Sequence, residues 1–408
     1  MRVALVTYGS RGDIEPMLGF AGELRALGVD VRMCAAPDFA ELLAAAGIPL
    51  TPIGWSVREM VKGEVGGDAP RPADSLSERA RVLAASTYEA VTEVAAEGCD
   101  AVVATGLIPA GAGARAAAEK LGVPYVSVSY FPTYLRSPHH PPLEWPGLAI
   151  PEGAMDNRAL WERNAAHMNT LFGGAVNAQR ESVGLAPVGD VIDHVFTLRP
   201  WLAADPALAP WIEPADLDVV QTGAWIRPDS RPLPPEVAAF LAAGEPPVYV
   251  GFGSMPLQDA AGVARAAVAA ARAHGRRVLL GSGWADLALS DEGDDCLVVG
   301  EVNQQDLFGR VAAAVHHGGA GTTTTAARAG APQVVVPQIA DQPYWAGRVA
   351  ELGIGAAHDG PNPTFASLSA ALGIALAPET LVRARALADT LVTDGAAVAA
   401  KLLVGRIG

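Results

Sequence analysis

The sequence predicts an α/β fold in which two doubly wound parallel sheets follow one another along the chain. Short unbroken runs rich in β-branched residues alternate with longer Ala/Leu-rich stretches, which is the pattern of parallel strands joined by crossover helices. The alternation stops at residues 225–235, where four of eleven residues are proline, and then restarts. At about 150 residues per domain, the 408 residues allow two or three domains.

The first half contains four expected strands, each a short apolar run. They lie at residues 3–7, 29–34, 101–105 and 125–129. The helical patterns around them lie at residues 16–27, 39–46, 77–96 and 110–121. From residue 131 to 151 the composition changes to proline, histidine and aromatic residues, so we expect a long functional loop or a lid there.

The second half repeats the alternation beyond the prolines. Its expected strands lie at residues 248–251, 278–281, 296–299, 312–316 and 333–336, and residues 379–407 predict two helices. We therefore expect a first domain over residues 1–222, a linker over 223–236 and a second domain over 237–408. The sequence leaves open whether the last helix stays with the second domain or returns to the first.

The composition excludes several classes of partner. The chain carries 29 basic and 44 acidic side chains, a formal net charge of −15, without a stripe of Lys and Arg. Because counterion release needs clustered positive charge, nucleic acid and anionic membranes are not expected partners. Cys34, Cys99 and Cys296 suggest neither a disulfide framework nor a thiolate metal site. With no signal peptide or membrane span, we expect a cytoplasmic protein that is monomeric or weakly dimeric.

The most informative segment runs from Val315 to Gln342. A strand ending at His316 is followed by three glycines within four residues and by a helix that is expected to begin near Thr322. Backbone amides and a helix N-terminus gathered in this way form an anion site, and the threonine suits the helix cap. His316 is expected to donate a hydrogen bond to a phosphate. Asp341 and Gln342, after the next strand, are expected to bind sugar hydroxyls. The alternative is a plain glycine turn beside a buried histidine.

Two further motifs accompany this segment. Residues 8–16 read Tyr-Gly-Ser-Arg-Gly-Asp-Ile-Glu-Pro, and residues 300–308 read Gly-Glu-Val-Asn-Gln-Gln-Asp-Leu-Phe. Together the three motifs resemble those of GT-B glycosyltransferases, in particular the antibiotic-tailoring branch that decorates glycopeptides and polyketides. The resemblance covers essentially the whole chain. It implies two Rossmann-like doubly wound domains facing across a cleft, with the acceptor in the first and a nucleotide sugar in the second.

The resemblance also implies roles for single residues. Asp13 matches the general base that deprotonates the acceptor hydroxyl, with Ser10 in the same turn; the alternative for Asp13 is a cap on a helix that begins at Pro16. The matches around the donor diphosphate are His316, Gly318, Gly319, Gly321 and Thr322. His317, in the same loop, either joins these contacts or orients the loop. Ser254 matches a contact to a phosphate or linker, and Trp284 and Val302 match positions beside the base. The expected acceptor contacts are Phe131, Tyr134, His139 and His140.

One departure from the resemblance bears on the donor. Plant-type members that use UDP-sugars carry a glutamate for the ribose hydroxyls eight residues after the first histidine, and here that residue is Thr324. This favours a dTDP-sugar, with UDP as the alternative. We expect an inverting transferase without metal or cofactor that moves a hexose or deoxyhexose to a hydroxyl of a natural product. The alternatives are a sterol or lipid transferase using a UDP-sugar, a nucleotide-sugar epimerase, and a non-catalytic binding partner.

Overall fold

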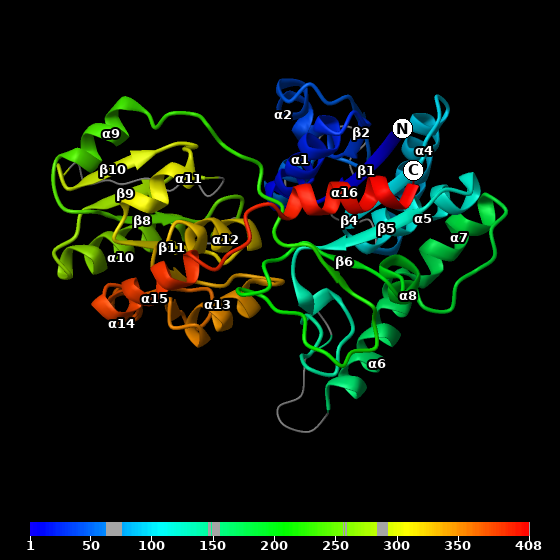
Figure 1. The fold of residues 1–408 in the computed structure, drawn as a ribbon. Helices are drawn as coiled ribbons and strands as arrows, with labels where there is room; N and C mark the ends of the chain where they lie inside the picture. The colour runs from blue at the N-terminus through cyan, green and yellow to red at the C-terminus, as the bar shows by residue number, and fades with distance from the viewer. Residues whose placement is uncertain are drawn as a thin grey trace. The chain divides into compact units, whose positions relative to one another are not determined.

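The computed structural model describes residues 1–62, 76–145, 148, 156–255, 257, 259–283 and 293–407. The chain divides into two compact units (Figure 1). Unit 1 comprises Met1–Pro206, Pro210–Arg227 and Val392–Gly408, and unit 2 comprises Ala207–Ala209 and Pro228–Leu391. Each unit is an α/β layer structure of its own, as the alternation of the sequence predicts.

Unit 1 is built on a parallel sheet of seven strands in its described residues, in the order β3-β2-β1-β4-β5-β6-β7. The strands are β1 (Arg2–Tyr8), β2 (Asp30–Ala35), β3 (Leu50–Pro52), β4 (Ala101–Gly106), β5 (Tyr125–Ser129), β6 (Trp201–Leu202) and β7 (Val220–Gln221). The helices are α1 (Arg11–Ala26), η1 (Pro37–Phe39), α2 (Ala40–Ala45), α3 (Val57–Lys62), α4 (Leu76–Ala95), α5 (Ile108–Leu121), η2 (Pro132–Tyr134), α6 (Asn157–Met168), η3 (Asn169–Gly173), α7 (Gly174–Ser182), α8 (Val191–Phe196) and α16 (Gly395–Ile407). The last helix, α16, packs against α1.

Helix α1 begins five residues earlier than the sequence analysis expects. Ser10 is the N-cap, and Asp13 closes a capping box with it, so the helix starts at Arg11 and Pro16 lies inside it. A proline is usual in the first turn of a helix, which made Pro16 look like a start signal. The reciprocal bonds of Ser10 and Asp13 fix the true start. Asp13 is therefore the third helical residue and not the cap of a later helix.

Unit 2 is built on a six-stranded parallel sheet in its described residues, in the order β10-β9-β8-β11-β12-β13. The strands are β8 (Val248–Gly251), β9 (Val278–Gly281), β10 (Cys296–Val299), β11 (Ala313–His316), β12 (Gln333–Val335) and β13 (Gly355–Ala357). The helices are α9 (Pro235–Ala242), α10 (Ala260–Ala273), α11 (Gln304–Leu307), η4 (Phe308–Arg310), α12 (Ala320–Arg328), α13 (Gln342–Glu351), α14 (Phe365–Ala375) and α15 (Pro378–Ala388).

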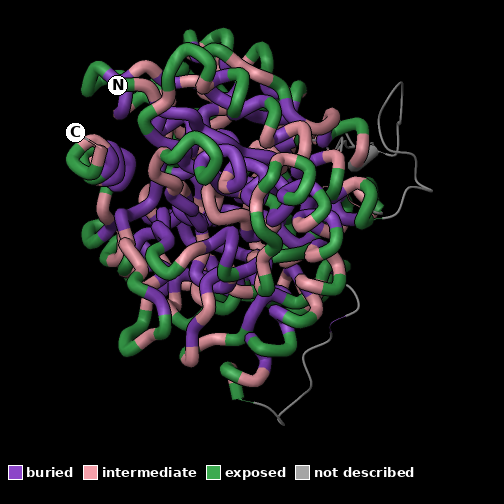
Figure 2. Tube along the Cα trace, turned by 90° about the vertical axis from the view of Figure 1, so that its right-hand side faces the viewer, coloured by how far each residue is buried: buried purple, intermediate pink, exposed green. Residues whose placement is uncertain are grey.

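Both faces of the second sheet are covered by apolar clusters. Val248, Val250 and Leu280 pack with α10 and α14 on one face, whereas Tyr249 and Leu279 pack with α9 and α12 on the other. Successive strand residues point to opposite faces, so an unbroken apolar run serves both clusters. Figure 2 shows the result, with buried positions in the interior and exposed positions on the outside.

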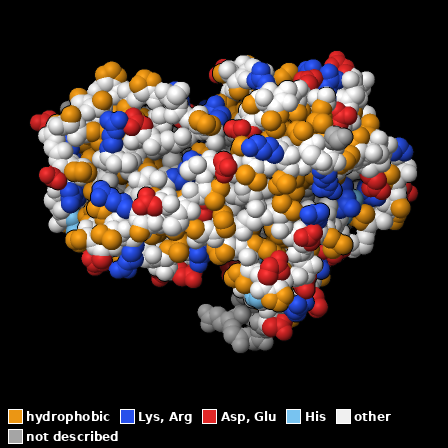
Figure 3. Space-filling model, viewed as in Figure 1, with side chains coloured by type: hydrophobic (Ala, Val, Ile, Leu, Met, Phe, Trp, Pro, Cys, Tyr) orange, Lys and Arg blue, Asp and Glu red, His pale blue; other side chains and the backbone are white. Residues whose placement is uncertain are grey.

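Charge and hydropathy of the surface agree with the composition. On the face drawn in Figure 3, Lys and Arg side chains are interspersed with Asp and Glu. Within the described residues no single helix has the length and apolar character to cross a membrane; α14 and α15 reach it only if counted together, and they are bent by 63°. Cys34, Cys99 and Cys296 are all free thiols.

Candidate active site

The glycine-rich segment lies at the carboxyl edge of the second sheet. The strand register pairs His316 with Gly251 of β8 and with Val335 of β12, so the loops after these three strands leave the sheet side by side. Ligands of open parallel sheets bind at this edge. Ser254 and His317 lie in the loops after β8 and β11, His316 ends β11, and Asp341 and Gln342 lie where the connection after β12 enters α13.

The turn after β11 needs glycine for two different reasons. Gly318 has a φ of +91°, and a Cβ there would lie 2.6 Å from Cγ1 of Val335. L-residues avoid this backbone region, and the space is filled as well. Gly319 has ordinary dihedrals, but a Cβ on it would lie 2.6 Å from Nε2 of His317. A side chain at Gly318 is therefore strained and blocked, whereas one at Gly319 displaces the His317 ring.

Helix α12 starts directly after this turn with its N-terminus uncapped by any side chain. Gly319 is the N-cap, and the first intrahelical bond is donated by the Thr323 amide to the Gly319 carbonyl at 2.9 Å. The helix thus begins at Ala320, and Thr322, which the sequence suggested as a cap, is its third residue. The amides of residues 320–322 precede the first bond. Such amides, with the positive end of the helix dipole, are the groups from which anion sites are built.

His316 is fully buried and bonded within unit 2 at both ring nitrogens. Its Nε2 lies 2.8 Å from Oε1 of Gln333, and its Nδ1 accepts the Gly318 amide at 3.0 Å. Burial lowers the pKa of His316 to about 4, so the ring is neutral. This arrangement differs from the expectation that its side chain donates to a phosphate, because its one N–H is used by Gln333.

His317 has the free nitrogen instead. Its ring lies against the glycine positions 253 and 319, and its Nδ1 is buried with no hydrogen-bond partner among the described residues. Burial lowers the pKa of His317 to about 3, so this ring too is neutral. A buried polar atom without a partner in a loop of amides is a group that a ligand can satisfy.

The remaining residues expected at the donor differ in their surroundings. Ser254 is half-buried in the loop after β8, next to the turn of Gly253 that His317 touches. Gln342 is buried, and its Oε1 accepts the amides of Gln338 and Ile339 at 2.7 and 3.1 Å. Asp341 accepts the indole N–H of Trp345 at 2.7 Å. Trp284 lies outside the described residues.

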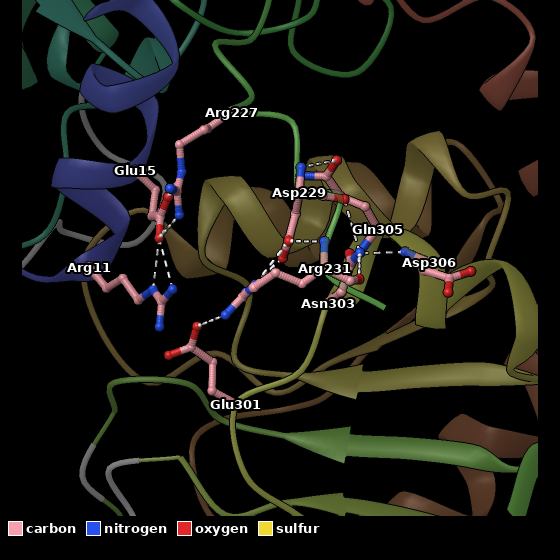
Figure 4. Close-up of polar contacts among 9 residues, drawn as sticks. All are labelled: Arg11, Glu15, Arg227, Asp229, Arg231, Glu301, Asn303, Gln305 and Asp306. Carbon is pink, nitrogen blue, oxygen red and sulfur yellow. Dashed lines mark hydrogen bonds and ion pairs between the residues drawn. The ribbon is translucent and has the colours of Figure 1, made fainter. Parts of the chain in front are cut away.

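The loop that carries Val302 is braced by side chains at its two ends. Nδ2 of Asn303 donates to the carbonyls of Asp229 and Arg231, at 2.9 and 2.8 Å, while its Oδ1 caps helix α11. Arg231 pairs with Asp229 and with Glu301 (Figure 4). Val302 itself packs partly against the apolar cluster below the loop. The loop is therefore fixed from both sides of Val302.

In unit 1, Asp13 stands at the carboxyl end of β1, in the first turn of α1. Its Oδ2 accepts the Ser10 amide at 2.7 Å and lies 3.5 Å from the Ser10 hydroxyl, whose oxygen accepts the Gly12 amide. Burial raises the pKa of Asp13 to about 6, and the Ser10 bonds oppose this only in part. A carboxylate with this pKa is a competent base near neutral pH.

Gly9 makes room for that carboxylate. A Cβ on Gly9 would lie 2.1 Å from Oδ2 of Asp13, so any other residue displaces the acid. Tyr130, which follows β5, donates its hydroxyl to the Asp13 carbonyl at 3.0 Å. Sequence reasoning missed Tyr130, although its place directly after a predicted strand was a usable signal.

Known proteins resemble this chain over its full length. Family models match residues 3–139, as the glycosyltransferase family 28 N-terminal domain, and residues 288–398, as the erythromycin biosynthesis protein CIII-like C-terminal domain. The chain is 57% identical to glycosyltransferase GtfE of Amycolatopsis orientalis, covering 100% of this chain and 98% of that protein. It belongs to the antibiotic-tailoring glycosyltransferases of the GT-B fold.

Two more relatives from Amycolatopsis orientalis support the family. The chain is 55% identical to vancomycin aglycone glucosyltransferase, covering 100% of this chain and 98% of that protein, and 50% identical to dTDP-epi-vancosaminyltransferase, covering 95% and 92%. The solved structure of the kitacinnamycin glycotransferase has a TM-score of 0.72 at 22% identity, covering 100% of this chain and 98% of that one. The protein is thus a glycosyltransferase, and its fold is GT-B.

The acceptor residues expected in this glycosyltransferase fall into two places. Phe131 and Tyr134 pack together, with ring centroids 4.8 Å apart, and Tyr134 lines a cavity of about 10 Å³ with Trp145 and Phe196. That volume holds about one water molecule. His139 contacts the Pro214 carbonyl through Nε2, at 2.8 Å, and His140 stacks edge-on between Trp161 and Trp211.

The start of α1 in the glycosyltransferase is anchored by charge. Glu15 accepts hydrogen bonds from Arg11, one turn before it, and from Arg227, at 2.8 Å each (Figure 4). Gly19 lies against the backbone of residues 226 and 227, where a Cβ would come within 2.9 Å. These contacts hold the helix that carries Asp13. Within the described residues, no group of three or more His, Cys, Asp or Glu has the arrangement of a metal site.

Proposed function

We propose that the glycosyltransferase moves a hexose or deoxyhexose from a dTDP-sugar to a hydroxyl of a natural-product aglycone, with inversion and without a metal. The uncapped N-terminus of α12 behind the Gly318–Gly319 turn carries the proposal, because it offers amides and a helix dipole to a diphosphate. The relatives named for a vancomycin aglycone and for a dTDP-sugar support the acceptor class and the donor.

The leaving group is held by unit 2. As the bond from the anomeric carbon to the diphosphate breaks, negative charge grows on the departing oxygen, and preorganised amides stabilise that charge. The neutral His317 ring, with its unsatisfied Nδ1, donates one further hydrogen bond when that nitrogen carries the proton. Gly318, Gly319, Gly321 and Thr322 shape the cradle, and Ser254 borders it.

The acceptor is activated in unit 1. Asp13 takes the proton of the acceptor hydroxyl while that oxygen forms the new bond to the anomeric carbon. Attack comes from the face opposite the leaving diphosphate, so a single displacement inverts the anomeric configuration. Ser10 orients the Asp13 carboxylate through its amide. Val302 borders the nucleobase, and the aromatic residues Phe131 and Tyr134 with His139 and His140 border the acceptor.

Helix α12, which follows the cradle, favours a donor nucleotide without a ribose 2′-hydroxyl. Position 324 of α12 is a buried threonine and not an acidic residue, so no carboxylate at that position binds the ribose hydroxyls. A dTDP-sugar has no 2′-hydroxyl, so its binding leaves no such group without a hydrogen-bond partner. The 2′-hydroxyl of a UDP-sugar finds no carboxylate at this position. Because the amides and the dipole already provide positive potential, the reaction needs no divalent cation or other cofactor.

The test is transfer with a panel of aglycones and of dTDP- and UDP-sugars, followed by mass spectrometry of the products. We expect transfer from dTDP-sugars that EDTA does not diminish, and loss of transfer in Asp13→Asn with little change in nucleotide affinity. Loss of activity in EDTA contradicts the metal-free cradle. Full activity of Asp13→Asn contradicts the assignment of the base, and exclusive use of UDP-sugars contradicts the donor.

A further inference from the structure

We propose that Gln333 is a positioning residue of the donor site, whose side-chain oxygen fixes the tautomer of His316 and thereby holds the Gly318 turn that exposes the helix amides. The inference rests on the donor cradle proposed above. It adds a residue that does not touch the ligand and assigns His316 a positioning role in place of a phosphate contact.

The tautomer follows from the hydrogen bonds in three steps. The Gly318 amide can only donate, so Nδ1 of His316, 3.0 Å away, must be an acceptor and carries no proton. The single proton of the neutral ring is therefore on Nε2. The atom that faces Nε2 at 2.8 Å must then be the oxygen of Gln333 and not its amide nitrogen.

The sheet builds this contact from two strands. The register pairs Gln333 of β12 with Ala314 of β11, and His316 lies two residues further along on the same face. Gln333 and His316 are both fully buried, so bulk water does not compete for either group. The oxygen of Gln333 is thus the acceptor of the Nε2 proton and, together with the Gly318 amide at Nδ1, stabilises this tautomer of His316.

The amide nitrogen of Gln333 indicates that the side-chain oxygen is the atom the site uses. The amide Nε2 of Gln333 is buried and has no hydrogen-bond partner among the described residues. An unsatisfied buried donor destabilises the fold, and an apolar side chain of similar size avoids that cost. A glutamine that leaves its nitrogen unpaired, next to the site, is explained by the need for its oxygen.

Loss of that oxygen acts on the cradle through the turn. Without that oxygen the buried Nε2–H has no acceptor, which favours the tautomer protonated at Nδ1. Two donors then face each other at Gly318, and the amide must rotate away. Gly318 stands at φ +91° with Val335 against it, so the turn has little room to adjust in place. The amides that follow move with it, and small displacements of preorganised donors weaken binding strongly.

The test variant is Gln333→Leu, which is close in size and has no oxygen. Its matched control is Val334→Ala, the next residue of β12, equally buried but directed to the opposite face of the sheet. Two quantities are measured in the full-length protein: the ring ¹⁵N shifts of His316 with labelled histidine, and the Kd for thymidine diphosphate by calorimetry. Thermal unfolding of both variants reports their general destabilisation.

We expect the wild-type His316 to show the Nε2–H tautomer at pH 7. Gln333→Leu should lose it and bind thymidine diphosphate about tenfold more weakly, about 1.4 kcal/mol, as expected for a buried hydrogen bond. Val334→Ala should keep both the tautomer and the affinity despite a lower melting temperature. This split separates positioning from loosening of the sheet.

Several results overturn the inference. An Nδ1–H or doubly protonated His316 in the wild type refutes it. This measurement needs no variant, so it remains decisive if Gln333→Leu does not fold. Unchanged affinity and tautomer in Gln333→Leu refute it, as does an equal loss of affinity in Val334→Ala. A wild type that shows the Nε2–H tautomer but does not bind thymidine diphosphate refutes the donor proposal and leaves the His316–Gln333 geometry supported.

Discussion

The substitution Gly9→Ala tests the position of the base without altering any group that takes part in the chemistry. A Cβ on Gly9 would stand 2.1 Å from Oδ2 and 2.5 Å from Cγ of Asp13, so the carboxylate must leave its place beside the Ser10 amide. The dihedrals of Gly9 are not in the left-handed region, so the added methyl group causes a clash and no backbone strain.

The magnitude follows from the bond that is lost. A hydrogen bond to a charged group contributes about 1.5–3 kcal/mol, which sets the scale of the loss of stability, and a positioned general base contributes about 10²- to 10⁴-fold in rate. We therefore expect kcat to fall by about 100-fold or more and the melting temperature to fall by only a few degrees. The Kd for thymidine diphosphate should not change, because the donor groups lie in unit 2.

The matched control is Gly12→Ala in the same turn. Its Cβ would lie 3.5 Å from the Ser10 hydroxyl oxygen, an ordinary contact, and the position is exposed. Alanine favours helix more than glycine does, so this variant should be as stable as the wild type and nearly as active. Steady-state kinetics and thermal unfolding of the pair decide the matter. If Gly9→Ala keeps the wild-type kcat, the account of Asp13 as a held base is wrong.

Two further predictions concern the pH profile and the glycine turn. Because burial raises the pKa of Asp13 to about 6 and only the ionised carboxylate accepts a proton, kcat/KM should rise with pH through a midpoint near 6; a profile flat from pH 5 to 8 would count against this. Gly318→Ala should lower the free energy of unfolding by at least about 1–2 kcal/mol and weaken thymidine diphosphate binding. The control Gly275→Ala, at a φ of +65° with open space around it, should lose stability alone. An equal loss of affinity in both variants would point to general unfolding.

Much of the fold could be predicted from local patterns. Strands such as β1, β8 and β11 are buried on both faces, so their apolar runs are unbroken and easy to locate. The strands β6 and β7 have two residues each, too few for any periodicity to be visible. The prediction for the start of α1 was wrong because Pro16 is a common residue of a first helical turn, whereas the reciprocal hydrogen bonds of Ser10 and Asp13 become evident only in the structure.

The site was predictable as a location and less so as a set of contacts. Glycines after a strand and before a helix mark the turn of Gly318 and Gly319, since backbone geometry demands them. The side-chain partners of His316 could not be inferred, because Gln333 is seventeen residues away and meets it only through strand pairing. The bonds of Gln342 could not be inferred either: its side-chain oxygen accepts two amides of its own loop, a contact set by local packing.

A crystal structure of the protein grown with thymidine diphosphate measures the account's main claim directly. We predict that the phosphate oxygens accept hydrogen bonds from the amides of residues 320–322 and from the His317 ring, while His316 remains bonded to Gln333. A diphosphate bound away from the N-terminus of α12, with those amides facing only solvent, would contradict it.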